Sequence, residues 1–241
     1  MVSCSCCLLF GSPESYLIQQ SSFRGVHCIS DFNLERIDEF KNARLRDEVR
    51  AATVNRDLAV LRRMLRIAEK KNLIPFTPSR EIEMLEERKE RRQPHILTFD
   101  EEQRLLATAA DHIRVLAILI LETGLRSGRE ALALKWADID FDDESIRIRH
   151  SKTLAGQRIV PMSSRCIAEL LRWREDFGPH FSEYVFAKPQ YPETHLRDVR
   201  ATWANALSAA GLEHFWLYDL RHSFASRITQ AGVSPPSLWL R

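Results

Sequence analysis

Two stretches in the first third of the chain carry the hydrophobic spacing of amphipathic helices. From Thr53 to about residue 72, apolar side chains recur at steps of three or four, which places them on one face of a helix. They are Val54, Leu58, Leu61, Leu65 and Ala68. A second pattern follows Asn33, a candidate N-cap, and runs to about Arg46. Its apolar positions are Leu34, Ile37, Phe40 and Leu45.

Beyond residue 97 the pattern mixes helices with short strands. Thr98 and Glu101 have the spacing of a capping box, which predicts a helix start. Further helices are expected over 111–122, 163–176 (with Ile167, Leu170 and Leu171 buried), 195–210 and 219–232. A β-hairpin is expected from 145–150 and 157–162, with a short strand at 184–186. The predicted class is mainly α with a small antiparallel β-hairpin or sheet, that is, α+β.

The very apolar run 115–121 is followed by the sequence TGLRSGRE at 123–130. Gly124 fits the left-handed position just after a helix end. Ser127 and Glu130 have capping-box spacing and predict a new helix there. Arg126 then lies in the turn between two helices, and two interpretations stay open. It caps carbonyl groups or pairs with Glu130, or it is directed at a phosphate.

Residues 72–97 are predicted to connect two units. Pro75 and Pro78 end the preceding helix, and a highly charged run leads to Pro94. We therefore expect a weakly ordered tail over residues 1–30 and a helical domain over 31–93 with a charged linker at its end. Residues 94–241 form the second domain.

The formal net charge is only +2, but positive charge is concentrated on the helix predicted from Thr53. Its six basic residues are Arg56, Arg62, Arg63, Arg66, Lys70 and Lys71, against the two acids Asp57 and Glu69. One interpretation is an ordinary solvated face. The other is a surface that lies along a phosphate backbone.

The five cysteines do not indicate a secreted disulfide framework, because their number is odd and three of them crowd into residues 4–7. No Cys or His set has zinc-site spacing, so no metal is expected. The sequence has no apolar run of about 20 residues, and its first residues lack a basic region typical of a signal peptide. We expect a cytoplasmic protein that does not engage a membrane.

Three basic residues lie at element boundaries or in the hairpin loop: Arg126, Lys152 and Arg221. Were they to converge, two guanidinium groups would bind the non-bridging oxygens of a phosphate, and an ammonium would supply charge or a proton. The sequence does not show that they converge.

The joint occurrence of these motifs resembles the tyrosine recombinase (phage integrase) family. TGLRSGREALALKWADID is similar to its T-G-L-R-x-x-E-x-x-x-L-x-W-x-D motif, a hairpin lysine follows, and LYDLRHSFAS is similar to H-x-L-R-H-[ST]-F-A. In the front half, ATVNRDLAVLRRMLRIAEKKNLI is similar to the helical core-binding domain that clamps DNA. The resemblance covers about residues 31–235.

The resemblance implies roles for particular residues. Arg126 and Arg221 would bind the scissile phosphate and stabilise its transition-state charge, and Lys152 would be a general acid for the leaving hydroxyl. Glu130 would hold Arg126, and His222 would be structural. On the helical domain, the expected DNA contacts are Asn55, Arg56, Arg62, Arg63, Arg66 and Lys70. The implied partners are double-stranded DNA and a homo-oligomer on DNA, with no metal and no small-molecule cofactor.

Three departures from the family pattern change the expectation. One extra residue separates Arg126 from Glu130, which makes Arg129 a lesser candidate for the role of the arginine. Tyr218 occupies the position of the motif histidine, and a phenol donates hydrogen bonds but is a poor base at neutral pH. No L-G-H box and no tyrosine follow Arg221; the tyrosines are Tyr16, Tyr184, Tyr191 and Tyr218.

The sequence therefore suggests a C-terminally truncated member that binds DNA and does not cleave it alone. A non-catalytic helical DNA-binding regulator and a non-functional gene remnant are the alternatives.

Overall fold

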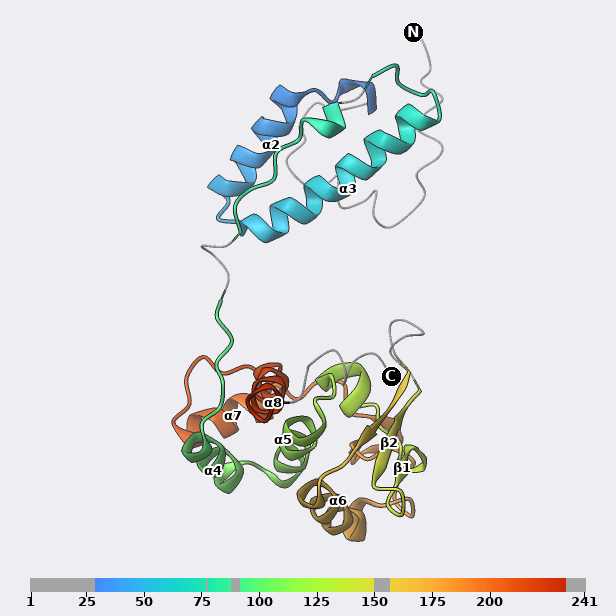
Figure 1. The fold of residues 1–241 in the computed structure, drawn as a ribbon, viewed down its shortest axis with the longest axis vertical. Coiled ribbons are helices and arrows are strands. Elements are labelled where there is room, and N and C mark those ends of the chain that lie inside the picture. Colours follow the sequence, from blue (N-terminus) through green and yellow to red (C-terminus); the bar gives the residue numbers. More distant parts are fainter. Residues whose placement is uncertain (1–28, 77, 88–91, 150–156, 233–241) are drawn as a thin grey trace. The chain divides into compact units, whose positions relative to one another are not determined.

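A computed structural model provides the structure of the protein and describes residues 29–76, 78–87, 92–149 and 157–232. The chain divides into two compact units, Met1–Arg92 and Gln93–Arg241 (Figure 1). The predicted tail over residues 1–30 lies outside the described residues, apart from residues 29 and 30.

The described part of unit 1 contains two helices, α2 (Leu34–Arg46) and α3 (Ala51–Lys70), with 3-10 turns at Ile29–Asp31 and Pro78–Arg80. The predicted N-cap is confirmed, because the Asn33 side chain accepts a hydrogen bond from the N–H of Arg36 at 2.8 Å. The start at Thr53 is wrong by two residues, since α3 begins at Ala51 without a side-chain cap.

The core of unit 1 is the stripe predicted for α3, packed against α2. All five stripe residues are at most 2% exposed, and they meet Ile37 and Phe40 of α2. Each fully buried Leu or Ile contributes about 1.5–3 kcal/mol relative to an exposed one. The beginning of the predicted connector also belongs to this core, because Ile74 and Ile82 are buried in the same cluster.

Unit 2 combines helices with two small antiparallel sheets, which confirms the α+β prediction. The helices are α4 (Phe99–Thr108), α5 (Asp111–Thr123), α6 (Ser164–Phe177), α7 (Arg200–Ala210) and α8 (Asp219–Gln230). The strands are β1 (Ile139–Asp140), β2 (Ser145–Ile148), β3 (Arg158–Pro161), β4 (Ala187–Lys188) and β5 (Tyr191–His195).

The predicted hairpin is confirmed. Strands β2 and β3 pair antiparallel with Ile146 opposite Val160 and Ile148 opposite Arg158, and β1 joins β2 on the other side. The hairpin loop at 150–156, with Lys152, lies outside the described residues.

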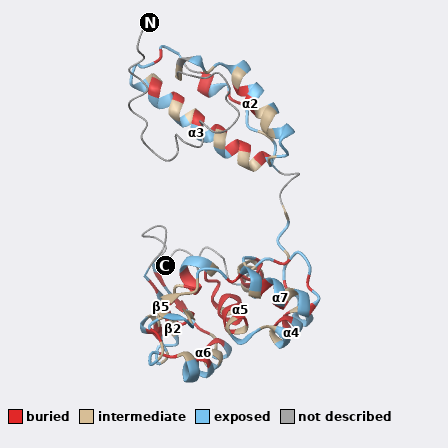
Figure 2. Cartoon of the chain, turned by 180° about the vertical axis from the view of Figure 1, so that it is seen from behind, coloured by how far each residue is buried: buried red, intermediate tan, exposed pale blue. Residues whose placement is uncertain are grey.

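Helix α5 is the central element of unit 2, as its apolar sequence predicts. It is buried along nearly its whole length (Figure 2). Helices α6 and α8 both pack against it, and α4 packs against α7. The capping box at Thr98 and Glu101 is present with both of its hydrogen bonds.

A buried carboxylate fixes α8 relative to its neighbours. Glu102 of α4 accepts from Arg165 of α6 at 2.5 Å and from Arg227 of α8 at 2.6 Å. In addition, the backbone N–H of Leu97 donates to the Ser223 hydroxyl at 2.9 Å. These contacts hold in place the helix that carries Arg221.

Three local predictions were wrong. Residues 184–186 form only an isolated bridge at Tyr184, and the paired strands are β4 and β5. Helix α7 begins at Arg200 rather than at residue 195, because β5 occupies 191–195. Leu171 of α6 is 44% exposed, whereas Trp173, two positions on, is buried. Among the described helices, none is long and apolar enough to cross a membrane.

Candidate functional site

The loop after α5 shows how the chain accommodates the extra residue between Arg126 and Glu130. Gly124 ends α5 in the left-handed conformation, with φ of 64°. Residues 127–131 then form a π turn, in which the N–H of Ala131 donates to the Arg126 carbonyl at 2.9 Å, five residues back. A π turn is one residue wider than an α turn, so the extra residue is absorbed within it.

Glu130 holds Arg126 despite the wider spacing. Its carboxylate accepts from the backbone N–H of Arg126 at 3.0 Å and from the Arg126 guanidinium at 2.5 Å. The predicted capping box is therefore wrong, because Glu130 caps Arg126 and the segment is a π turn rather than a helix started by Ser127. The Arg126 side chain is 49% exposed, so it is fixed at one side and open at the other.

Arg221 lies beside this loop although it is distant in sequence. It belongs to the first turn of α8, and its guanidinium donates to the carbonyl oxygen of Gly124. Burial and the neighbouring positive charge of Arg126 lower the pKa of the Arg221 guanidinium. The sequence could not show that Arg126 and Arg221 converge, and the structure brings them together.

A third arginine, Arg158, was not a candidate in the sequence. It opens β3, and its guanidinium donates to both oxygens of Glu130, at 2.9 and 3.4 Å. Its side chain is 4% exposed and that of Glu130 is 1% exposed. The strand alternation contained the signal, because Arg158 shares the inward-facing side of β3 with Val160.

The cluster therefore concentrates positive charge. Burial alone would raise the pKa of the Glu130 carboxyl, but hydrogen bonds from Arg158 and Arg126 hold it below its usual range. The charges of Arg126 and Arg158 both act to lower the pKa of Arg221, and Glu130 acts to raise it. Arg126, Arg158 and Arg221 carry three positive charges near the single negative charge of Glu130. This excess favours binding of an additional anion, and guanidinium forks match phosphate oxygens.

Two aromatic side chains shortly before Arg221 in the sequence are exposed to solvent. Tyr218, the residue before α8, is 48% exposed, and Trp216 is 55% exposed. The Tyr218 ring meets the His222 ring edge-on, with centroids 5.1 Å apart. Tyr218 is close enough to Arg221 to affect its pKa. The phenol at the motif histidine position is therefore beside the arginine that it would assist. Lys152, the remaining predicted member of the site, lies outside the described residues.

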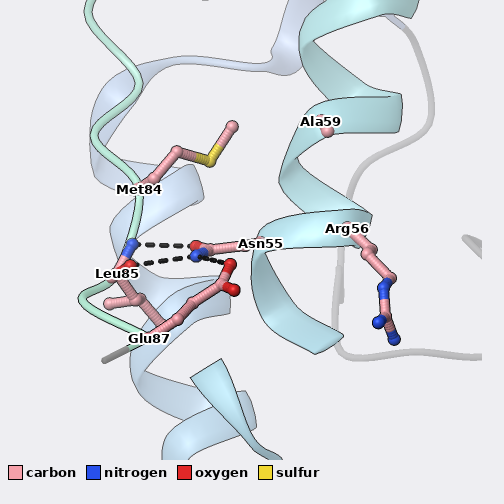
Figure 3. A pocket seen from close by; sticks show the side chains of 6 residues that line it. All are labelled: Asn55, Arg56, Ala59, Met84, Leu85 and Glu87. Atoms are coloured by element: carbon pink, nitrogen blue, oxygen red, sulfur yellow. Dashed lines mark hydrogen bonds between the residues drawn. The ribbon is translucent and has the colours of Figure 1, made fainter. Parts of the chain in front are cut away.

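In unit 1 the structure separates the predicted DNA contacts into two groups. Asn55 is buried. Its side-chain amide donates to the carbonyl of Leu85 at 2.9 Å and accepts from the N–H of Leu85 at 2.8 Å. It also donates to Glu87 at 2.6 Å (Figure 3). Arg62 donates to the carbonyl of Ile82. Both side chains thus fasten residues 82–87 onto α3, and the expected role of Asn55 in DNA contact is not supported by its position.

Figure 3 shows Arg56 pointing away from this hydrogen-bonded group. The shallow hollow drawn there is lined by Asn55, Arg56, Ala59, Met84, Leu85 and Glu87. The lining contains one acid, Glu87, and one basic residue, Arg56, and the Asn55 amide is already hydrogen-bonded. The hollow therefore has no surplus of positive charge to bind a phosphate.

Four basic residues do form one exposed surface on α3. They are Arg56, Arg63, Arg66 and Lys70, named here the basic stripe. At about 100° per residue they lie within about 80° of the helix circumference, opposite the buried stripe. Asp57 and Glu69, the two acids of α3, fall outside that sector. A row of like charges with no acid between them is suited to a phosphate backbone.

The model of the phage integrase family matches residues 95–238. The chain belongs to the tyrosine recombinase (phage integrase) family. The match covers the loop with Arg126, the hairpin and α8 with Arg221.

Among curated relatives, the chain is 26% identical to the tyrosine recombinase XerC of Xanthomonas campestris pv. campestris. That alignment of 222 residues covers 90% of this chain and 67% of the relative. The chain thus spans about two thirds of the length of this relative.

Solved structures of integrases share the fold. An integrase of transposon Tn1549, in complex with a circular intermediate DNA, aligns with a TM-score of 0.79 and 17% identity over 94% of this chain and 82% of that one. A lambda integrase tetramer bound to a Holliday junction aligns with a TM-score of 0.70 and 20% identity, covering 88% of this chain and 64% of that one.

Proposed function

We propose that this tyrosine recombinase family member is a DNA-binding protein of DNA integration and recombination. In unit 2, Arg126 and Arg221 hold a phosphodiester of double-stranded DNA, with Lys152 beside them in the hairpin loop. In unit 1, the basic stripe contacts the DNA backbone. The observation that supports this most is the convergence of Arg126 and Arg221 on the Gly124–Glu130 loop, with Arg126 half exposed.

We further propose that the 241 residues alone do not cleave DNA. In the family a tyrosine attacks the phosphodiester, forms a 3′-phosphotyrosyl link and releases the 5′-hydroxyl of the broken strand. Of the three tyrosines that the structure describes, Tyr218 is the one whose charge acts on Arg221, and it lies at the position of a different motif residue. A homo-oligomer on DNA is part of the proposal as a binding assembly. Because its protomers share this sequence, cleavage would require a tyrosine supplied by a different recombinase protomer on the same DNA. The expected location is the cytoplasm, and no cofactor is needed.

Binding and chemistry are tested separately. For chemistry, the purified chain is incubated with a nicked suicide substrate carrying its recombination site, and covalent protein–DNA adducts are resolved on a denaturing gel. No adduct is expected. An adduct would overturn the inactivity proposal, and its loss in Y218F would identify Tyr218 as the nucleophile.

For binding, the dissociation constant for a DNA duplex is measured against salt concentration by fluorescence anisotropy. Reversing Arg63 and Arg66 to Glu is expected to weaken binding and to lower the salt slope by about two or more, because each phosphate contact contributes about one. The control R46E/R50E reverses two exposed charges of unit 1 outside the basic stripe. Equal losses in both double variants would show that the stripe has no special role.

A non-catalytic DNA-binding regulator is the second candidate, favoured by the basic stripe itself. The discriminating variants are R126A and R221K. If both retain wild-type DNA affinity while R63E/R66E loses it, the chain binds through unit 1 and the arginine cluster is not in use. A non-functional remnant is the third candidate, and a purified chain without a cooperative melting transition would support it.

A further inference from the structure

We propose that Arg158 is a positioning residue that fixes Arg126 in its phosphate-binding orientation by clamping Glu130 between β3 and the π turn. This rests on the proposed function of the Arg126 site. It assigns a role to a residue that the sequence motifs leave unassigned.

The first observation is how the Glu130 carboxylate is shared. One oxygen accepts from the Arg126 guanidinium at 2.5 Å and from Arg158 at 3.4 Å. The other accepts from the Arg126 backbone N–H at 3.0 Å and from Arg158 at 2.9 Å. Each oxygen thus joins the two arginines, so the carboxylate cannot rotate without breaking contacts to both.

The second observation is the difference in exposure along this chain of contacts. The side chains of Arg158 and Glu130 are 4% and 1% exposed, whereas that of Arg126 is 49% exposed. A buried two-point ion pair has little freedom of movement, because its planar fork fits the carboxylate. The buried pair is therefore the fixed support, and Arg126 is the group that reaches solvent.

The third observation is where Arg158 is anchored. Its backbone pairs with Ile148 in the hairpin, and it lies 28 residues from Glu130 in the sequence. Arg158 thus connects the β2–β3 pair to the Arg126 loop, two segments that the sequence separates.

The fourth observation is the width of the π turn. With one extra residue, the turn is wider than a standard helical turn. The N–H groups of Ala131 and Leu132 each donate to the carbonyl five residues earlier in the sequence, which closes the turn. Arg158 adds a side-chain clamp from a neighbouring strand, which holds Glu130 from outside the turn.

A direct contact between Arg158 and DNA is the alternative role. The 4% exposure of its side chain leaves almost no surface for a phosphate. An arginine that acts through Glu130 predicts a different response to mutation from one that touches DNA. The two roles can therefore be separated experimentally.

The first experiment reads the orientation of Arg126 without DNA. In the ¹⁵N-labelled full chain, the Nη1–H signal of Arg126, from the group that donates to Glu130, is assigned by its absence in R126A. In the wild type this signal is expected to be dispersed and slow to exchange with water. In R158M its exchange is expected to become at least about tenfold faster, with an intermediate rate in R158K, which keeps the charge but lacks the fork.

The control is R114M. Arg114, on α5, pairs with the largely buried carboxylate of Glu169 at 3.1 Å, away from Glu130 and from α8. This variant is expected to leave the Arg126 signal unchanged. An unchanged Arg126 signal in folded R158M, or in R158K should R158M fail to fold, would overturn the proposal, as would an equal change in R114M.

The second experiment is a double-mutant cycle in DNA affinity with R126A, R158M and R126A/R158M. If Arg158 acts through Arg126, R158M weakens binding about threefold or more in the wild type and has little effect in the R126A background. Additive losses would instead show that Arg158 acts independently. If R126A itself has no effect on affinity, the proposed function fails, whereas the exchange measurement still decides the positioning role.

Discussion

The ring of Phe224 in α8 lies directly against Gly124 at the end of α5. A Cβ atom built on Gly124 would be 2.4 Å from Cδ1 of Phe224, closer than any real contact. The two residues are 100 positions apart in the sequence, and each belongs to one of the arginine motifs. Their close approach accompanies the hydrogen bond from Arg221 to the Gly124 carbonyl, so the geometry of the proposed phosphate site depends on the absence of a side chain at position 124.

Replacing Gly124 by alanine is therefore expected to destabilise unit 2. The substitution adds left-handed strain, since φ is 64°, and an overlap with Phe224. Together these lower the free energy of unfolding by about 2–4 kcal/mol. The matched control is G128A, because a Cβ at Gly128 meets nothing within 4 Å. Urea unfolding of both variants tests this, and similar losses would contradict it.

The Glu130 carboxylate is expected to make stability depend on acid pH. Its pKa in the folded protein lies below the ordinary value of 4.5, because hydrogen bonds from Arg158 and Arg126 outweigh the effect of burial. Its contribution is therefore fully present above about pH 5 and is lost as the pH falls through the lowered pKa. E130Q is expected to lose about 3 kcal/mol at neutral pH, and this difference should shrink on acidification.

Urea unfolding of the wild type and E130Q between pH 7 and pH 3 measures that difference. A stability gap that stays constant over the whole range would show that the carboxylate does not titrate as expected.

The two groups of residues on α3 are expected to respond differently to truncation. N55A leaves the backbone N–H and carbonyl of Leu85 without their amide partner and should lower the free energy of unfolding by about 1–3 kcal/mol. Hydrogen exchange at the Leu85 amide should accelerate. R56A, one residue along, should change stability by less than about 0.5 kcal/mol but weaken DNA binding. The reverse pattern would restore Asn55 as a DNA contact.

A histidine at position 218 is expected to introduce pH dependence into DNA binding. Tyr218 is 48% exposed, and it is near enough to Arg221 to act on the pKa of that guanidinium. An ordinary histidine gains its proton near pH 6.5, and the charged form binds phosphate better than the neutral form. Y218H should therefore bind DNA more tightly as the pH falls from 8 to 6, while Y218F should resemble the wild type in its pH profile. Parallel profiles for Y218H and the wild type would place residue 218 outside the DNA contact.

Several elements of the fold could be read from local sequence. The period of the apolar residues in α3, the Asn33 cap and the Thr98 capping box require only neighbouring residues, and all three are present. The apolar sequence of α5 and the glycine after it likewise located the central helix and its end. The family motifs identified Arg126 and Arg221, because residue type and order are properties of the sequence.

The capping box at Ser127 and the DNA role of Asn55 depended on long-range partners. The Glu130 carboxylate was expected to bond to the backbone of Ser127, but it bonds to Arg126 and Arg158. Arg158 belongs to a strand and lies 28 residues away in the sequence. From the sequence, Asn55 was assigned to a basic helix face. In the structure, residues 82–87 lie against α3, and the Asn55 amide donates to Leu85 and Glu87.

The sequence by itself thus determined the helices, the hairpin and the two arginines of the motifs, since these follow from local periodicity and residue order. Only the tertiary structure decided that the arginines meet, that a π turn absorbs the extra residue, and that Arg158 supports the carboxylate between them. The physical reason is that a buried ion pair requires a specific approach of distant segments. Hydrophobic periodicity predicts that segments are buried, but it does not predict which polar groups meet inside.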